Sequence, residues 1–491
     1  MLPRASDGRS LDELRETLEA AGYTTDAIQE RLGSGRISFA APEVAVHLRR
    51  LRAGERFSAL VKLFFFGLTV PASETRTALG RPTIRRLCEA DWLEAVGDGV
   101  RAALKLVPHG DLLVASDRDS GDAKPADWVA GVHPPSVTLA KLTVRRPVGS
   151  VLDVATGNGI QAMLASRHAE AVIAADINSR ALAVAALNAR LNRIRTIELR
   201  QGSFFEPVDG ERFDLVTCNP PYVISPESRY AFRDSGLPGD TVSRDLVQQA
   251  PMFLNEGGFA HILVSWAHEV DDPWSPLERW VDGSGCDSWL LHFGSDDPIS
   301  HAGEWLGPLA LEDPVRHEES LGEWLAYCDR LGIEAIAHGA VILRRRAGGR
   351  SWVRRDDVSL ERLEQASDHV VRVFASQDYL EALPDERAML DAAFRLAERH
   401  HLEQTLRYRG GEAESRGSVL TLDEGLGFRI AVDRHTERLL PLLDGRRPLR
   451  EVLEQCSGEL ALDDENRARF ESAALPVVRR LVELGFVVPA A

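Results

Sequence analysis

The chain has 491 residues, 44 % of them hydrophobic, and a formal net charge of −17 at pH 7. One hydrophobic core does not organise a chain of this length, so about three domains are expected. No run of ~18 apolar residues occurs, and the first ten residues lack the apolar centre of a signal peptide. The composition therefore argues against a membrane-spanning protein and against a secreted one.

The five cysteines are scattered and form no CxxC pair. We therefore expect neither a metal site nor a disulfide framework, and a reducing cytoplasm is the expected compartment. The acidic balance opposes general nucleic-acid binding and favours a cationic ligand or a basic protein partner. It leaves the oligomeric state open.

Residues 1–130 predict helices followed by a small β element. Helical apolar spacing recurs in residues 11–20, 25–32, 44–51 and 57–66, and a further helix is expected over 81–89. Two apolar runs around Pro108-His109-Gly110-Asp111 predict a hairpin. Helices that close on a hairpin resemble a winged-helix module, and both a docking role and a structural cap on the next domain stay open.

From Val148 strand and helix patterns alternate, which indicates an α/β domain with a doubly wound, mostly parallel sheet. Seven strands are predicted over residues 131–355, with an insertion rich in Trp, Glu and Asp near 296–331. The pattern breaks in a basic stretch near Arg344. Residues 356–491 then predict helices, strands and a second winged-helix-like module.

Residues 151–160 read VLDVATGNGI, a strand, a glycine turn and the start of a helix. Glycine allows backbone to approach a ligand closely. A dinucleotide fingerprint has no acid ahead of the turn, whereas Asp153 stands there, and a second acid, Asp176, closes the next strand.

This arrangement resembles the class I S-adenosylmethionine-dependent methyltransferases over about residues 148–346. The resemblance implies that the glycine turn lies against the methionine part of the cofactor and that Asp176 accepts hydrogen bonds from the ribose hydroxyls. The turn GSFFEP is then expected to enclose the adenine. The implied cofactor-binding residues are Asp153, Ala155, Thr156, Gly157, Gly159, Asp176, Ile177, Ser203, Phe204 and Asn219. Ala155 stands where many members have glycine, and Ser203 where a common variant has Asp.

Asn219-Pro220-Pro221-Tyr222 closes the fourth predicted strand. It matches the NPPY motif of methyltransferases that modify planar nitrogen, and in detail the chain resembles the HemK-like protein-glutamine N5-methyltransferases. The resemblance gives the catalytic roles to Asn219, Pro220 and Tyr222. The Asn219 side chain and the Pro220 carbonyl can accept the two donors of an NH₂ group, and Tyr222 offers a flat face.

The sequence thus predicts an N-methyltransferase for a planar NH₂, with a glutamine amide of a protein or peptide as the acceptor. Two alternatives stay open, an exocyclic amine of RNA or DNA and a binding protein that keeps the fold without catalysis. The acidic charge disfavours the nucleic acid.

Further residues carry weaker expectations. His133 precedes the first strand, where a plain loop is favoured and a lid over the cofactor, with Ser136 and Thr138 as contacts, is the alternative. The basic cluster at 344–355 is typical of a solvated strand end, and it is also the chain's best candidate for a phosphate or acidic contact. Core packing is favoured over a substrate wall for Trp289, Trp305 and Trp324, and His400, His401 and His435 are expected to be ordinary surface or core histidines.

Overall fold

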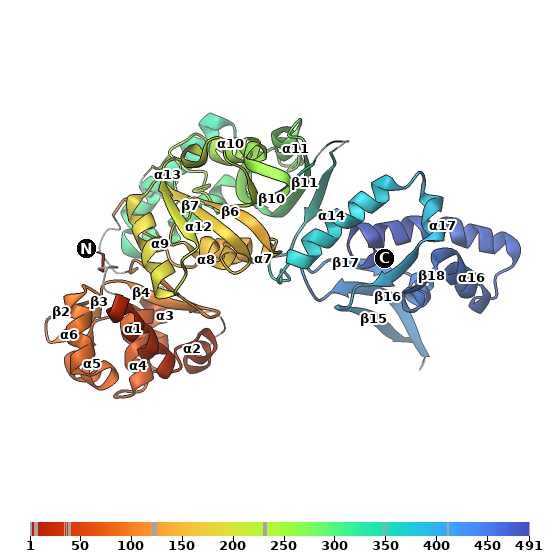
Figure 1. Ribbon diagram of the computed structural model, residues 1–491. Coiled ribbons are helices and arrows are strands. Elements are labelled where there is room, and N and C mark those ends of the chain that lie inside the picture. Colours follow the sequence, from red (N-terminus) through yellow and green to blue (C-terminus); the bar gives the residue numbers. More distant parts are fainter. Residues whose placement is uncertain are drawn as a thin grey trace. The chain divides into compact units, whose positions relative to one another are not determined.

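The computed structural model describes residues 2–3, 8–33, 35, 37, 41–119, 125–228, 233–346, 348, 351–409 and 412–490. The chain forms two compact units (Figure 1). The first comprises Met1–Leu139 and Pro147–Asp356, and the second Ala140–Arg146 and Asp357–Ala491. None of the helices in the described ranges is long and apolar enough to cross a membrane.

The predicted N-terminal helices are present. They are α1 (Gly8–Ala20), α2 (Thr25–Leu32), α3 (Ala41–Leu48), α4 (Arg56–Leu60) and α6 (Arg81–Glu89). A further helix, α5 (Ala72–Leu79), was not predicted. The helix expected over 57–66 changes after Leu60 into the π-helical turn η1 (Val61–Phe65), and both parts are buried. A small sheet has the order β1-β3-β2, formed by Val70–Pro71, Gly99–Ala102 and Leu93–Val96. The winged-helix assignment of this module stays a prediction.

The predicted hairpin, β4 (Lys105–His109) and β5 (Leu112–Ser116), also lies where expected. Its second strand is bound by two asparagines of helix α9 (Ser179–Leu191) and its C-cap. Asn188 Oδ1 accepts from the Ala115 N–H at 2.7 Å, and its Nδ2 donates to the Ala115 carbonyl at 3.0 Å. Asn192 repeats this pair on Leu113, at 2.9 and 2.7 Å. Four helical residues rise about as far as two strand residues, ~6 Å, so the two side chains act like a neighbouring strand.

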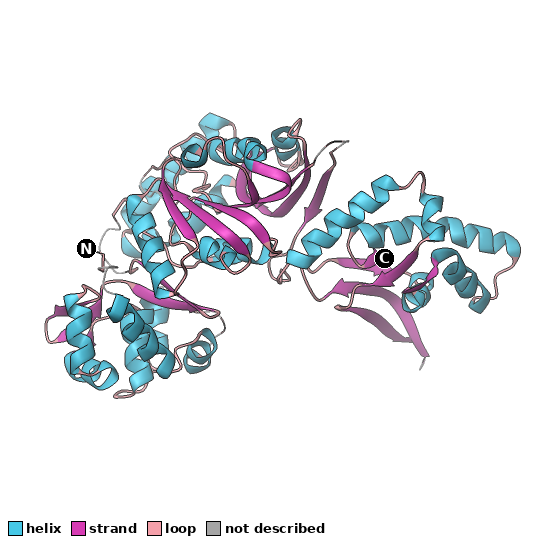
Figure 2. Cartoon of the chain, in the orientation of Figure 1, coloured by secondary structure: helices cyan, strands magenta, loops and turns pink. Residues whose placement is uncertain are grey.

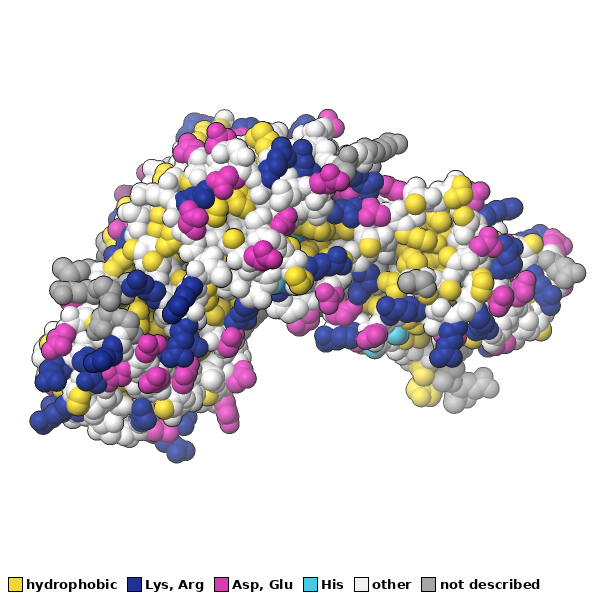
Figure 3. Space-filling model, viewed as in Figure 1, with side chains coloured by type: hydrophobic (Ala, Val, Ile, Leu, Met, Phe, Trp, Pro, Cys, Tyr) yellow, Lys and Arg dark blue, Asp and Glu magenta, His cyan; other side chains and the backbone are white. Residues whose placement is uncertain are grey.

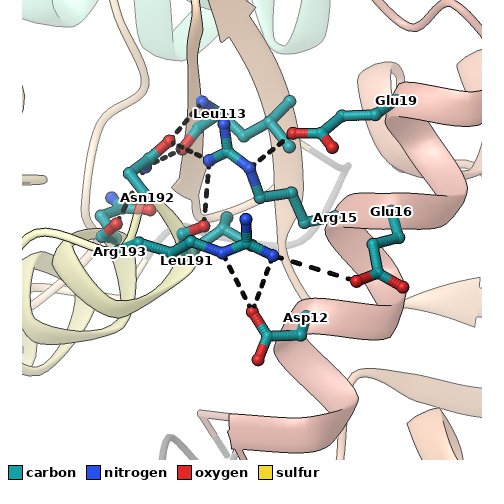
Figure 4. Close-up of polar contacts among 9 residues, drawn as sticks. Asp12, Arg15, Glu16, Glu19, Leu113, Leu191, Asn192 and Arg193 are labelled. Atoms are coloured by element: carbon teal, nitrogen blue, oxygen red, sulfur yellow. Dashed lines mark hydrogen bonds and ion pairs between the residues drawn. The ribbon is translucent and has the colours of Figure 1, made fainter.

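Helix α1 contacts the same end of α9 (Figure 4). Arg15 Nη1 donates to the Leu191 carbonyl at 3.1 Å and to Asn192 Oδ1 at 3.0 Å. Arg193 pairs with Asp12 at 3.2 Å in the opposite direction. A cation beside the last carbonyls of a helix is favourable, because those carbonyls carry the negative end of the helix dipole. The N-terminal module is therefore bound to the sheet domain through the C-terminal end of α9.

The central sheet has the strand order β13-β11-β12-β10-β9-β6-β7-β8. Figure 2 shows its strands in magenta with cyan helices around them. These strands are β6 (Val148–Val154), β7 (Ala169–Asp176), β8 (Ile197–Gln201), β9 (Phe213–Cys218), β10 (Leu254–His268), β11 (Cys286–Asp296), β12 (Ala335–Arg345) and β13 (Val353–Asp357). The five strands from β8 to β10 run parallel, and β12 is antiparallel to both of its neighbours. The α/β prediction is confirmed. β13 is an eighth strand that the sequence analysis did not predict, because the basic residues around it obscure a strand pattern.

Both faces of the sheet are covered, as expected for buried parallel strands. Val151 and Leu215 pack with Ala162 of α8 (Ile160–Ala165) on one face. Their neighbours Leu152 and Val216 belong to the core on the other face, which includes α10 (Thr241–Gln249) and α11 (Ser275–Val281). Successive residues point to opposite faces, which explains the continuous apolar runs of β6 and β9.

Two further segments remain to be described. α7 (Pro134–Leu142) precedes β6, and its last three residues belong to the second unit. The predicted insertion between β11 and β12 is a helical hairpin, α12 (Pro298–Glu312) and α13 (Pro314–Leu331), with Asp297 and Asp313 as N-caps.

The second unit combines long helices with two small sheets. One sheet has the order β18-β14-β19 (Asp444–Pro448, Ala393–Leu396 and Val487–Pro489), and the other β15-β16-β17 (His400–Arg409, Glu412–Leu422 and Arg429–Val432). The helices are α14 (Ser367–Ala382), α15 (Arg434–Leu439), α16 (Leu449–Glu459) and α17 (Asp464–Glu483). Its winged-helix assignment also stays a prediction.

Asn188→Ala should destabilise the first unit strongly. The side chain is fully buried, and its loss leaves the N–H and carbonyl of Ala115 and the Asn158 carbonyl without this partner. Each buried polar group left unpaired costs ~1–3 kcal/mol, so a loss of at least ~2 kcal/mol is expected. Asn192→Ala is the matched control, because Asn192 is half-buried and water can replace its amide. Urea unfolding measures the loss of stability in both variants. Equal losses would contradict the argument that burial of Asn188 makes its hydrogen bonds harder to replace than those of Asn192.

Candidate cofactor and acceptor site

A cavity of about 520 Å³ lies at the carboxyl ends of the parallel strands. β6 stands between β7 and β9, and the chain leaves β6 in one direction for β7 and β8 and returns on its other side with β9 and β10. Ligands of open α/β sheets bind at such a switch point. The volume falls within the usual range of small-molecule sites.

The glycine turn forms the floor of this cavity. Gly157 and Gly159 have φ of 57° and 83°, and Ala155 adopts a left-handed φ of 54° as well. A Cβ on Gly159 would lie 3.0 Å from the Ala185 Cβ, so this glycine allows the turn to pack on α9. Ala155 is the departure from glycine noted in the sequence, and its conformation costs ~1–2 kcal/mol relative to an ordinary one.

Asp153 holds the turn from beneath. One oxygen accepts from the Thr156 hydroxyl at 2.6 Å and from the Ala162 N–H at 3.2 Å. The other accepts from the Thr217 hydroxyl on β9 at 2.9 Å. Burial raises the pKa of Asp153 to about 6, although these hydrogen bonds oppose the rise. The carboxylate therefore joins the turn, α8 and β9 within the protein.

Asp176 stands at the end of β7 and lines the cavity. Its two oxygens accept the N–H groups of Gly157 and Asn178, each at 2.8 Å. Burial raises the pKa of this carboxyl above its ordinary value. Each carboxylate oxygen can accept a second hydrogen bond, so the group retains acceptor capacity for a ligand.

The turn after β8 supplies the next wall. Ser203 and Phe204 line the cavity, and the Ser203 N–H donates to Glu206 at 3.1 Å. Phe204 has a φ of 46°, a conformation that few aromatic residues adopt. Ile177 lines the cavity too and is 64 % exposed, which is high for an isoleucine.

A strap formed by residues 126–131 covers part of the cavity, and the sequence analysis did not assign it. Asn158 Nδ2 donates to the Ala130 carbonyl at 2.9 Å, and Asn178 Nδ2 to the Asp127 carbonyl at 3.1 Å. The Val129 N–H and carbonyl both bind Asp117, which follows β5. The sequence gives little indication of such a segment, because the strap has no periodicity and its hydrogen-bond partners are distant in the chain.

His133 lies beside the strap. His133 and Ser136 both line the cavity, and the His133 Nδ1 lies 2.9 Å from the Ser136 hydroxyl. Burial lowers the pKa of His133. Thr138 is not among the lining residues of the described ranges.

The NPPY segment begins directly after β9. Asn219 and Pro221 line the cavity, and no side chain or backbone group of the described residues forms a hydrogen bond with the Asn219 amide. Pro220 is buried and its carbonyl already accepts the Tyr222 N–H at 2.9 Å, which leaves one lone pair for a ligand. Tyr222 packs against the sheet core, and burial raises the pKa of its phenol. Within the described ranges, Gly159, Pro220 and Tyr222 do not line the cavity themselves.

Known proteins resemble this chain over the region that forms the site. Residues 134–272 match the methyltransferase small domain. A Methanocaldococcus jannaschii protein named as a protein N5-glutamine methyltransferase is 32 % identical over 138 residues, which are 26 % of this chain and 68 % of that protein. The chain belongs to the HemK-like class I S-adenosylmethionine-dependent methyltransferases.

Two bacterial relatives extend the comparison. The release factor glutamine methyltransferase of Geobacter sulfurreducens is 34 % identical, over 26 % of this chain and 49 % of the relative. The ribosomal protein uL3 glutamine methyltransferase of Bradyrhizobium diazoefficiens is 36 % identical, over 28 % and 47 %. This HemK-like chain thus spans about half the length of these curated relatives.

The flanking regions match separate models. Residues 20–103 match a domain of unknown function (DUF7059), and residues 371–489 match another (DUF7782). Among solved structures, the ribosomal protein L11 methylase of Lactobacillus delbrueckii subsp. bulgaricus is 26 % identical over 32 % of this chain and 72 % of its own, with a TM-score of 0.24.

The residues of this HemK-like site suit S-adenosylmethionine. Asp176 offers acceptor oxygens of the kind that bind two ribose hydroxyls, and the open side of Gly157 leaves room for a ligand against the backbone. Phe204 provides an aromatic wall for a purine. A cationic sulfonium is also favoured beside two buried carboxyl groups, Asp153 and Asp176.

Several other residues that the sequence analysis singled out make contacts within the protein. Trp289 and Trp324 are fully buried, as core packing predicts. In the described part of the basic cluster, two arginines are already paired with a protein carboxylate. Arg344 and Arg346 both pair with buried Asp287, at 2.5 and 3.0 Å, because the strand edge needs these cations to neutralise an internal carboxylate. Farther along the chain, His400 binds the Ala397 carbonyl and His401 binds Asp423.

The raised pKa of Asp153 gives a signed prediction for stability. A carboxyl whose folded pKa of about 6 exceeds its ordinary 3.8 stabilises the fold below pH 4 and loses that contribution as the pH rises through 6. This group alone should lower the free energy of unfolding by up to ~3 kcal/mol between pH 4 and 7. Asp153→Asn should flatten that slope. Unfolding measured for both proteins at pH 4, 5, 6 and 7 tests this, and parallel pH profiles would contradict it.

Proposed function

We propose that this chain methylates the side-chain amide nitrogen of a glutamine in a protein. The observation that carries the proposal is the Asn219 amide, which lines the cofactor cavity and has no hydrogen-bond partner among the described residues. Buried polar groups normally find partners, and a half-buried amide without a protein partner is open to water or to a ligand. An acceptor substrate with an NH₂ group provides one.

The chemistry of an amide nitrogen fits these residues. Its lone pair is delocalised, so the nitrogen is a poor nucleophile that gains most from positioning. Asn219 Oδ1 can accept one N–H, and the remaining lone pair of the Pro220 carbonyl can accept the other. Two acceptors favour the positive charge that develops on nitrogen. Bound cofactor supplies the electrophilic methyl group, and the products are the N-methylated amide, S-adenosylhomocysteine and a proton.

A protein acceptor is favoured over a nucleic acid. The named relatives act on a release factor and on a ribosomal protein. On the face shown in Figure 3, basic and acidic side chains are intermingled over both units. A phosphate backbone is bound by a continuous basic track, and the net charge of −17 works against it.

The acceptor class is tested by methyl transfer from labelled cofactor to three purified substrates, a release factor, ribosomal protein uL3 and total RNA. Label in a protein, recovered after hydrolysis as N5-methylglutamine, is the expected result. Label only in RNA would replace the proposal with the nucleic-acid alternative. No label in any substrate, with cofactor bound, would favour the non-catalytic binding protein.

Asp176→Ala should weaken cofactor binding. Hydrogen bonds to a charged group contribute ~1.5–3 kcal/mol, so affinity should fall about ten- to a hundredfold. Asp214→Ala is the control, because that carboxylate binds Ser150 and Asn255 and does not line the cavity. Calorimetry with S-adenosylhomocysteine measures both. Equal affinity in the two folded variants would assign the ribose to another group.

Asn219→Ala should bind cofactor normally and lose about 10²–10³ in kcat, by analogy with other groups aimed at developing charge. Asn219→Asp keeps an acceptor oxygen and adds a negative charge near the sulfonium. It should therefore bind cofactor at least as well and still turn over differently. Tyr222→Phe should be mild, because the ring and its packing against the sheet core remain. Single-turnover methyl transfer measures all three, and parental turnover by Asn219→Ala would reduce the motif to a turn.

A further inference from the structure

The helical hairpin α12–α13 contacts the segment that follows the NPPY motif. We name the described parts of that segment, residues 223–228 and 233–239, the acceptor loop. Its two parts meet where the Val223 N–H donates to the Arg233 carbonyl at 3.3 Å. Five of its residues line the cavity beside Asn219, namely Ser228, Asp234, Ser235, Gly236 and Leu237.

The first contact is a buried histidine of α12. His301 is fully buried, and its Nε2 lies 2.9 Å from the Ile224 carbonyl, so the neutral ring donates from this nitrogen. The ring stacks on the His338 ring of β12, with 5.7 Å between the ring centroids. It makes a tilted contact with the Trp324 ring of α13 at the same centroid separation. The carbonyl two residues after the motif is therefore held by a ring with little freedom to turn.

The second contact fixes the polar centre of the loop. Trp324 Nε1 donates to Glu227 at 3.2 Å, and Glu227 pairs with Arg233 at 2.5 Å. The Arg233 guanidinium also pairs with buried Asp234 and lies 5.9 Å above the Trp324 ring. One tryptophan thus supports both described parts of the loop.

The third contact fixes the end of the loop. The Tyr327 hydroxyl accepts the Gly239 N–H at 2.8 Å. Apolar packing supports the same arrangement. Val223 packs with Ala302, Leu306 and Trp324. Ile224 packs with Cys328, Ile333 and Ile336. The hairpin therefore holds the beginning, the centre and the end of the acceptor loop.

We propose that the α12–α13 hairpin sets the position of the acceptor loop and thereby selects the methyl acceptor, with His301, Trp324 and Tyr327 as positioning residues. This inference rests on the proposed function. The opposite walls of the cavity are held by other contacts, through Asp153, Asn158 and Asn178, so the hairpin acts on the acceptor and not on the cofactor. The matched methyltransferase region ends at residue 272, before the hairpin begins. Acceptor choice can therefore differ from that of the relatives while cofactor binding stays the same.

Two pairs of matched variants test the proposal. Trp324→Phe removes the donor to Glu227, whereas Trp305→Phe makes the same change in the same hairpin at an indole N–H that has no partner in the described structure. Tyr327→Phe removes the acceptor for Gly239, whereas Tyr379→Phe removes a hydroxyl of the second unit that is likewise without a partner among the described residues.

The readouts are amide hydrogen exchange of peptides covering 223–239, calorimetry with S-adenosylhomocysteine, and methyl transfer to purified release factor. Trp324→Phe and Tyr327→Phe should speed exchange of the loop by roughly two- to tenfold, the factor expected for one lost hydrogen bond, while their controls leave it unchanged. Cofactor affinity should stay within about twofold of the parent, and KM for the release factor should rise more than kcat falls.

Unchanged exchange, or a loss of cofactor affinity that parallels the change in exchange, would overturn the proposal. A rise in release factor KM in Trp305→Phe equal to that in Trp324→Phe would overturn it as well. If the parent protein does not methylate the release factor, that acceptor is wrong, and the exchange and calorimetry arms still decide whether the hairpin holds the loop independently of the cofactor.

Discussion

The buried carboxylate of Asp153 is the interaction on which the rest of the site depends. It binds the glycine turn through Thr156, the first turn of α8 through the Ala162 N–H, and β9 through Thr217. Thr217 lies two residues before Asn219. The same carboxylate therefore fixes the turn that meets the cofactor and the strand end that presents the acceptor motif, and an error in its position would move both.

This arrangement has an energetic cost that the neighbouring groups limit. An ionised carboxylate is unfavourable in a buried site, and three donors compensate only in part, so the pKa of Asp153 stays raised. Asp176, a short distance farther along the cavity, is raised for the same reason. A cation bound between them would relieve both, which gives the apo site a preference for a positively charged ligand. The left-handed Ala155 and Phe204 add backbone strain at the same edge, as functional sites often do.

The cavity takes its walls from three separated parts of the chain. The strap at 126–131 follows the N-terminal hairpin, which α9 holds through Asn188 and Asn192. Asn188 also donates to the Asn158 carbonyl within the glycine turn at 2.8 Å, so the hairpin and the cofactor turn share one side chain. The acceptor loop depends on α12–α13 in turn. The strap and the α12–α13 hairpin, which support these walls, both lie outside the matched region of residues 134–272.

The sequence by itself determined the features that depend on short-range geometry. The turn at 155–159, the acid that ends β7 and the rigid Asn219-Pro220-Pro221-Tyr222 segment are each set by a few adjacent residues, and the alternation from Val148 predicted the α/β sheet. The hairpin over 105–116 was readable for the same reason, because its strands are neighbours in the chain.

Only the tertiary structure decided which distant segments meet. Nothing in the apolar pattern of the insertion indicates that Trp324 binds Glu227 or that Tyr327 binds Gly239, since the periodicity of a helix shows that one face is buried and does not name the partner. The strap lacks periodicity altogether, and β13 is a short strand of one valine and four charged residues. The pairing of Arg344 and Arg346 could not be predicted for a related reason, because their charge is visible in the sequence, whereas the buried Asp287 that neutralises it is brought there by strand pairing.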